Sequence, residues 1–233
     1  MGEIAKVWKN RNSRYDTRVF TWFSFYCMKK ILLTLSLLFV LSACTGGGSS
    51  LGTVSSETRT IAAPTLGSWK HTVEIFADFQ CPACINFNKT IGPVLEWYAE
   101  KGQLQIVYRQ YPLTQIHDNA FRDAMAALCS AEQNKYQEYK SALYSLEESK
   151  AGAVVSDTDR VALAKTVGLD EAQMTTCLAS NAYEAQVNAD IARGESMNVN
   201  ATPTIMLDGK KLDLWAFRDL NMVTKFFDQV VAQ

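Results

Sequence analysis

The chain has 233 residues, 48% of them apolar, and its 23 Lys and Arg nearly balance its 24 Asp and Glu. Such a composition can bury a core, which excludes a disordered or collagen-like chain. Without residues 1–43 the chain would keep 16 basic and 22 acidic side chains, a net charge of −6. Because a nucleic-acid surface needs clustered Lys and Arg, we expect no nucleic-acid partner.

Residues 28–44 have the pattern of a bacterial lipoprotein signal peptide. A basic start, Met28-Lys-Lys30, precedes a largely apolar run at 31–41 and the small residues before Cys44. The run of 11 residues is too short to span a bilayer but fits the hydrophobic part of a signal peptide. Leu41-Ser-Ala-Cys44 resembles a lipobox, in which the cysteine carries the lipid. The alternative is an ordinary signal peptide with a cysteine near its end.

The segments on either side of this peptide are predicted to lie outside the folded domain. Residues 1–27 are basic and aromatic without a clear period, so we expect translation to start at Met28; a long basic leader is the alternative. Residues 45–50 are Gly/Ser-rich and suit a membrane tether. We expect the linker to continue to residue 70 because Ser, Thr, Gly and Pro are frequent there.

The domain is predicted to begin near His71 with a strand, a helix and a second strand. Residues 72–79 are rich in β-branched and aromatic residues, which indicates a buried strand. A helix with a bend near Gly92-Pro93 is expected at 85–97, and a strand at 103–109. The intervening helix makes the two strands parallel.

Residues 118–197 are predicted to be helical. Asp118 can cap a helix that reaches residue 143, and Ser156-Asp-Thr-Asp is a capping box for a helix that Gly168 ends. The remaining expected elements are helices at 170–178 and 181–197, a hairpin at 203–213 and a final helix at 215–231.

The spacing of Cys81 and Cys84 puts both thiols on one face at the start of the first helix. Exposed N–H groups and the helix dipole lower the pKa of a cysteine there, and Pro82 fits a first turn. Such a pair could also bind zinc. Zinc needs four ligands, and past Cys44 only Cys129, Cys177 and two histidines remain, without ligand spacing. We therefore expect neither a metal nor another cofactor.

Three parts of the sequence together resemble one known family. They are Phe76-Ala-Asp-Phe-Gln-Cys-Pro-Ala-Cys84, the helical block, and Ala201-Thr-Pro-Thr204 before the hairpin. From about residue 70 onward the chain resembles the DsbA-like branch of the thioredoxin superfamily. The resemblance implies an α/β thioredoxin fold with a helical insertion at about 114–197. It covers nearly the whole chain past the linker.

The resemblance also implies roles for the residues that match. Cys81 would be the nucleophile, and Cys84 the thiol that resolves the mixed disulfide. Pro203 would be a cis-proline, and the backbone of Thr202 would pair with substrate. A plain turn before a strand is the alternative for Thr202-Pro203, since a strand may begin with proline in either case.

Two departures from the family leave the redox direction open. Ala83 stands where strongly oxidising relatives have a histidine, and Ile75 stands where many relatives keep a buried acid. The nearest carboxylate is Asp78, which could relay a proton to or from Cys84 or cap the helix.

The expected function is that of an exported, lipid-anchored thiol–disulfide oxidoreductase of the cell envelope. It would introduce disulfides into folding proteins and be reoxidised by a quinone-linked membrane partner. One alternative is a reductase or isomerase served by a thiol reductant. Another is a binding module that uses the disulfide structurally.

Cys129 and Cys177 are the expected structural disulfide. Once Cys81 and Cys84 pair locally, these two remain as partners, and an oxidising compartment favours the bond. Two buried free thiols are the alternative. The bond requires Cα atoms within about 7 Å.

Overall fold

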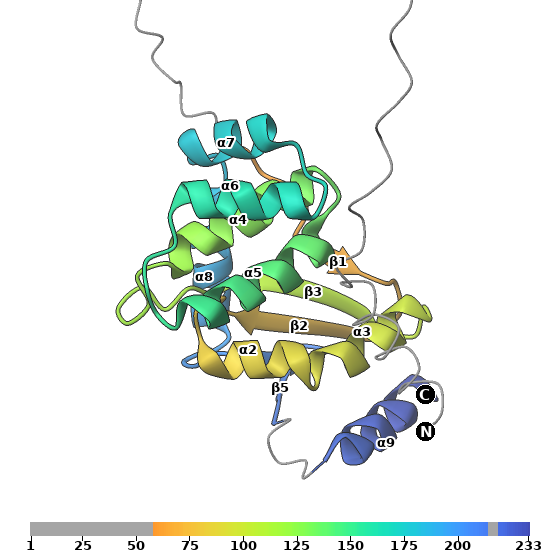
Figure 1. Cartoon of the computed structure of the whole chain (residues 1–233). Helices are drawn as coiled ribbons and strands as arrows, with labels where there is room; N and C mark the ends of the chain where they lie inside the picture. The colour runs from red at the N-terminus through yellow and green to blue at the C-terminus, as the bar shows by residue number, and fades with distance from the viewer. Residues whose placement is uncertain (1–57, 214–218) are drawn as a thin grey trace, which may run out of the picture. The chain divides into compact units, whose positions relative to one another are not determined.

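The computed structural model describes residues 58–213 and 219–233, which form a five-stranded sheet with associated helices (Figure 1). The strands are β1 (Thr65–Leu66), β2 (Thr72–Ala77), β3 (Gln105–Gln110), β4 (Thr204–Leu207) and β5 (Lys210–Leu212). The helices are α2 (Pro82–Lys89), α3 (Gly92–Glu100), α4 (Ala120–Glu132), α5 (Tyr136–Lys150), α6 (Asp157–Thr166), α7 (Glu171–Ala179), α8 (Glu184–Ser196) and α9 (Leu220–Val231).

The sheet has the strand order β1-β3-β2-β4-β5. The central strands β2 and β3 are parallel, as the strand-helix-strand pattern predicted, and the other neighbouring strands are antiparallel. The predicted bend of the first helix is a break between α2 and α3, where Gly92 and Pro93 begin the second helix. The hairpin turn at Asp208-Gly209 is also present, with positive φ at both residues.

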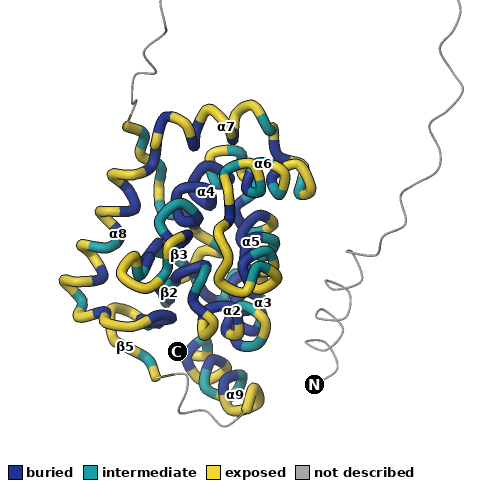
Figure 2. The backbone as a smooth tube through the Cα atoms, turned by 60° about the vertical axis from the view of Figure 1, so that its left-hand side comes forward, coloured by how far each residue is buried: buried dark blue, intermediate teal, exposed yellow. Residues whose placement is uncertain are grey.

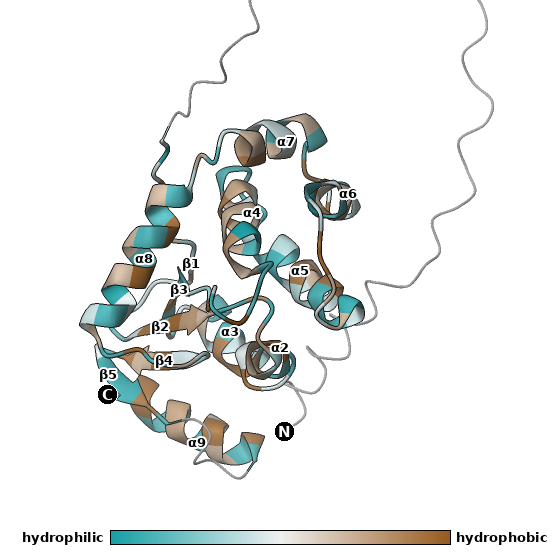
Figure 3. Ribbon diagram, turned by 90° about the vertical axis from the view of Figure 1, so that its left-hand side faces the viewer, coloured by the Kyte–Doolittle hydropathy of each residue, from teal (hydrophilic) through white to brown (hydrophobic). Residues whose placement is uncertain are grey.

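The alternation of side chains along β2 gives the sheet two buried faces. Val73 and Ile75 belong to the main core with residues of α2, α3 and α9. Phe76 belongs to a smaller cluster with Tyr111 and Met206, against which Ile191 of α8 packs. Figure 3 shows α8 on one side of the strands and α2 and α3 on the other. The sheet is therefore covered on both faces.

Helix α8 approaches the sheet closely because one of its residues is a glycine. A Cβ atom on Gly194 would lie 2.5 Å from the Tyr111 ring and 3.2 Å from the Phe76 ring. Beside this contact, the buried Glu74 of β2 accepts hydrogen bonds from Arg193 and Arg109. The bond from Arg193 is the main cause that lowers the pKa of Glu74. The Glu74 carboxylate buried on this face is thus paired with two arginines.

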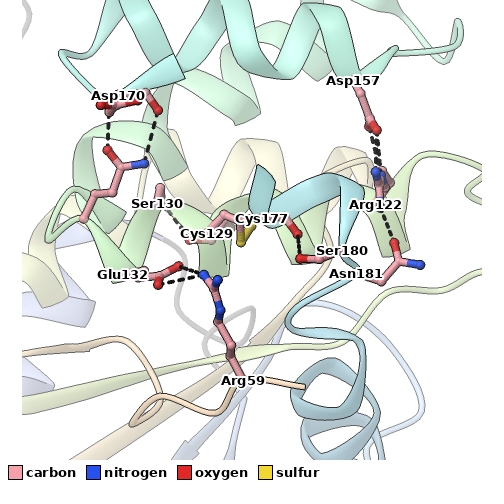
Figure 4. Close-up of a disulfide and its surroundings, with 12 residues drawn as sticks. Arg59, Arg122, Cys129, Ser130, Glu132, Asp157, Asp170, Cys177, Ser180 and Asn181 are labelled. Atoms are coloured by element: carbon pink, nitrogen blue, oxygen red, sulfur yellow. Dashed lines mark hydrogen bonds and ion pairs between the residues drawn. A yellow bond between two sulfur atoms is a disulfide. The ribbon is translucent and has the colours of Figure 1, made fainter. Parts of the chain in front are cut away.

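Helices α4 to α8 fall within the predicted insertion at about 114–197, and a disulfide joins two of them. Cys129 of α4 and Cys177 of α7 are bonded with Cα atoms 6.0 Å apart, so the free-thiol alternative is wrong (Figure 4). The capping box of Ser156 and Asp159 opens α6 as predicted. Figure 2 shows that α4 is mostly buried, whereas α6 and α7 expose much of their surface.

The predicted helix at 118–143 is wrong in two respects. It is divided into α4 and α5, and Asn134 between them has a φ of 57°. Asp118 does not cap it, because the N-cap residue of α4 is Asn119 and that side chain makes no capping bond. Asparagine tolerates left-handed backbone better than most residues, which explains where the chain can turn.

The predicted linker also extends too far toward the domain. The N–H groups of Arg59 and Ile61 donate to Ala182 O and Gln186 Oε1 at 2.8 and 2.9 Å. β1 then pairs with β3 at the sheet edge. Residues 58–70 are therefore attached to the folded domain through backbone hydrogen bonds, a feature that composition alone does not reveal.

Several expectations fall outside the described residues: the leader, the signal peptide, Cys44, the tether and the segment at 215–218. Within 58–213 and 219–233, no helix is both long and apolar enough to cross a bilayer.

Candidate active site

The two cysteines of the Cys-Pro-Ala-Cys segment lie where β2 passes into α2. Cys81 is the N-cap residue of α2, with extended backbone angles, and Pro82 occupies the first helical turn. Both thiols are free. Cys81 keeps 8% of its surface exposed, whereas Cys84 is fully buried. A substrate can therefore reach the sulfur of Cys81 more readily than that of Cys84.

The pKa values of the two thiols are shifted in opposite directions. A hydrogen bond from Cys84 is the main cause that lowers the pKa of Cys81 to about 5. Contacts with Thr202 and the N–H groups of the first turn of α2 act in the same direction. Burial, followed by the neighbouring Cys81, raises the pKa of Cys84 well above its ordinary value. At neutral pH this arrangement favours a thiolate on Cys81 and a thiol on Cys84.

The loop before β4 lies against the Cys81 thiol. The Thr202–Pro203 peptide bond is cis. The Cys81 Sγ atom donates to the carbonyl oxygen of Thr202 at 3.4 Å. The Thr202 side chain is buried beside the same sulfur and helps to lower the pKa of Cys81. The predicted cis-proline is thus confirmed, and the Thr202 backbone stands beside the reactive sulfur.

Asp78 is buried next to the cysteines, but it does not cap α2. Its carboxylate accepts hydrogen bonds from the N–H groups of Gln80 and Leu113, both at 2.8 Å, and from His117 Nδ1 at 2.7 Å. Its backbone N–H points at Cys84 Sγ, 3.5 Å away. In the sequence, His117 stands out only as one of the two histidines available to bind zinc. No local pattern could place it here, because 39 residues separate it from Asp78.

A groove of about 510 Å³ opens beside Pro82. Its walls are one face of α2, the segment before α4 and the end of α5, and include Ile85, Ile116, His117 and Glu148. Among residues 58–213 and 219–233, no three His, Cys, Asp or Glu side chains gather as a metal-binding group.

A dithiol at the start of the helix that follows β2, opposite a cis-proline loop that leads into the antiparallel strand β4, is the arrangement of a thioredoxin-fold redox site. The family model described as Thioredoxin matches residues 65–224, and the chain belongs to this family. Residues 28–45 match the model of the prokaryotic membrane lipoprotein lipid attachment site.

Solved structures share the fold. Oxidised BdbD from Bacillus subtilis is 21% identical, with a TM-score of 0.64, and the match covers 77% of this chain and 98% of that one. Reduced DsbA from Mycobacterium tuberculosis is 22% identical, with a TM-score of 0.58, and the match covers 73% and 93%. The fold is therefore that of DsbA structures.

Curated relatives match part of the chain. A probable disulfide bond formation protein D from Bacillus anthracis is 23% identical over 137 residues, which is 58% of this chain and 63% of that protein. A Na(+)/H(+) antiporter NhaA 1 from Mycolicibacterium gilvum is 27% identical over 140 residues, or 60% of this chain. The match spans only 22% of the antiporter's length.

Proposed function

We propose that the chain is a thiol–disulfide oxidoreductase of the cell envelope that donates the Cys81–Cys84 disulfide to folding proteins. The observation that carries this proposal is the position of the Cys81 thiol, at the start of α2 and between the Thr202 backbone and the fully buried Cys84. This position lowers the pKa of Cys81 to about 5. A stabilised thiolate stabilises the reduced form, and a stable reduced form makes the disulfide a stronger oxidant.

The reaction proceeds through a mixed disulfide at Cys81. A substrate thiolate attacks Cys81 Sγ, the Cys81–Cys84 bond breaks, and Cys84 leaves with the electron pair and takes up a proton. A second substrate thiolate then attacks the substrate sulfur of the mixed disulfide and releases Cys81 as a thiolate. The substrate loses two electrons and two protons, and the dithiol gains the electrons. The backbone of Thr202, beside Cys81 Sγ, would hold the substrate segment.

A quinone-linked membrane partner would reoxidise the dithiol. The runner-up function is disulfide reduction or isomerisation, driven by a thiol reductant. Ala83 favours it, because this side chain cannot stabilise a neighbouring thiolate as a histidine could.

The reduction potential of the pair tests the proposal. A value nearer to the DsbA level of about −120 mV than to the isomerase level of about −180 mV supports the oxidase. A value between about −180 and −270 mV indicates a reductase or isomerase. A value below about −300 mV, with no exchange activity, would leave only a structural disulfide.

We also propose that a lipid on Cys44 anchors the protein. The lipid-attachment match at residues 28–45 supports this. Cys44→Ala should move the protein from the membrane fraction to the soluble fraction and remove the lipid from its mass. Retention of this variant in the membrane would show that the anchor is something else. One acyl chain binds a membrane only weakly, so we expect more than one.

A further inference from the structure

His117 connects the solvent-facing groove to the turn that holds both cysteines. We propose that His117 is a positioning residue that sets the reactivity of the Cys81–Cys84 pair through Asp78. This inference rests on the proposed function only because that function uses the Cys81–Cys84 dithiol. The effect of His117 on the pKa of the thiols and on their reduction potential can be measured whatever the dithiol does.

The first step of the argument is that the backbone of Asp78 contacts both cysteines. Its N–H donates to Cys84 Sγ at 3.5 Å. Its carbonyl oxygen accepts the N–H of Cys81 at 3.3 Å. A change in the orientation of Asp78 would therefore alter the hydrogen bonds that its backbone makes with Cys81, at the start of α2, and with the buried Cys84 sulfur.

The second step is that His117 helps to hold the Asp78 side chain. The carboxylate is fully buried, and a buried charge is costly unless hydrogen bonds compensate it. Two of its donors are backbone N–H groups, and the third is His117 Nδ1 at 2.7 Å. The His117 side chain is 14% exposed and lines the groove.

The third step is electrostatic. An anionic carboxylate near a thiol disfavours the thiolate, and each donor that compensates the carboxylate reduces this effect. Tyr144 lies close to both the cysteines and Asp78. Its pKa is raised first by burial and then by nearby charges, which include those of Cys84 and Asp78. Loss of the His117 donor should therefore raise the pKa of Cys81. The reduced form would be less stable, and the disulfide would be a weaker oxidant.

The test compares His117→Ala with His117→Asn in the full chain. The Asn side chain places an N–H donor near the position of Nδ1. We expect His117→Ala to lower the equilibrium constant for oxidation of glutathione about tenfold, or about 30 mV. The alkylation midpoint of Cys81 should rise by about one pH unit. His117→Asn should restore most of both changes. Equal behaviour of the Ala and Asn variants, or no change in either, would overturn the proposal.

A double-mutant cycle shows whether His117 acts through Asp78. In an Asp78→Asn background, which lacks the carboxylate charge, His117→Ala should change the equilibrium constant by less than about threefold. A full tenfold effect in that background would mean that His117 acts directly. If His117→Ala folds poorly, His117→Leu fills the site without a donor and gives the same readings.

His71 is the matched control. Its Nδ1 atom also pairs with an aspartate, Asp208 on the β4–β5 turn, at 2.8 Å, and its side chain is 19% exposed. His71→Ala should leave the glutathione equilibrium and the Cys81 midpoint unchanged. A wild-type protein that transfers no disulfide would refute the proposed function, yet the effect of His117→Ala on the potential could still be measured. Failure of the proposed function and failure of the proposed role of His117 would therefore give different results.

Discussion

The two cysteine pairs of the domain differ in surroundings far more than in burial. Cys81 and Cys84 are free thiols at the start of α2. Cys129 and Cys177 are 48 residues apart and join α4 to α7. All four are buried, with exposed fractions between 0% and 8%. Burial alone therefore does not tell a reactive pair from a structural one.

What distinguishes the pairs is the set of hydrogen-bond donors near the sulfur atoms. The Cys81 sulfur contacts Cys84, Thr202 and the N–H groups of a helix start. Around the other pair, Ser180 Oγ donates to the carbonyl oxygen of Cys177, and the neighbouring ion pairs join residues other than the cysteines (Figure 4). The first environment stabilises a thiolate, and the second holds helices together.

The largest effect is expected for the reactive pair. Cys81→Ser should reduce disulfide transfer to a peptide dithiol to background, because the attacked sulfur is gone. Cys84→Ser should accumulate mixed disulfides, visible on non-reducing gels. Both variants should unfold at nearly the wild-type denaturant concentration. Residual transfer by Cys81→Ser would show that Cys84 can be attacked directly.

The structural pair should affect stability instead. Combining Cys129→Ala with Cys177→Ala opens a loop of 48 residues, so we expect a loss of about 4 kcal/mol in the free energy of unfolding. Urea unfolding under non-reducing conditions measures it. The reduction potential of Cys81–Cys84 should stay the same. A large shift in that potential would contradict the separation of the two pairs.

The pH dependence of Cys81 gives a smaller effect with a definite sign. Its lowered pKa means that the extra stability of the reduced form is fully present above the ordinary thiol value, near 8.5. It is lost as the pH falls toward about 5. Alkylation by iodoacetamide should therefore reach a plateau above pH 5 to 6 and fall about tenfold per pH unit below it. A midpoint near 8.5 would show that Cys81 is not activated.

The smallest effect is expected at the surface next to the structural disulfide. Arg59 pairs with Glu132 of α4 at 2.9 Å, and both side chains are about one-third exposed. Arg59→Gln should lower the free energy of unfolding by less than about 1 kcal/mol, since exposed ion pairs contribute little. Urea unfolding beside the cysteine double variant provides the comparison. A loss as large as that of the disulfide would mean that the segment before β1 is a major structural support.

Local patterns in the sequence predicted much of this molecule. The β-branched run of β2, the capping box of α6 and the Asp208-Gly209 turn each depend on neighbouring residues, and each is present. The position of Cys81 and Cys84 at a helix start was predictable for the same reason. A helix start and its cysteines lie in one short segment.

Contacts between distant segments were not predictable in this way. The pairing of Asp78 with His117 depends on how the segment before α4 packs against β2. The attachment of Arg59 and Ile61 to the domain depends on acceptors more than 100 residues later. The Cys129–Cys177 pairing was reached only because the other cysteines were already assigned.

The edges of the sheet limit how the protein can associate with other extended chains. On one side β1 covers part of β3 and is itself only two residues long. On the other side β5 has three residues and carries exposed lysines at 210 and 211. Short, charged edge strands discourage pairing with a further strand, which is a common route to aggregation. Among the described residues, the sheet therefore has no long edge to which an unfolded polypeptide could add a strand. Contact with an unfolded polypeptide thus need not lead to aggregation.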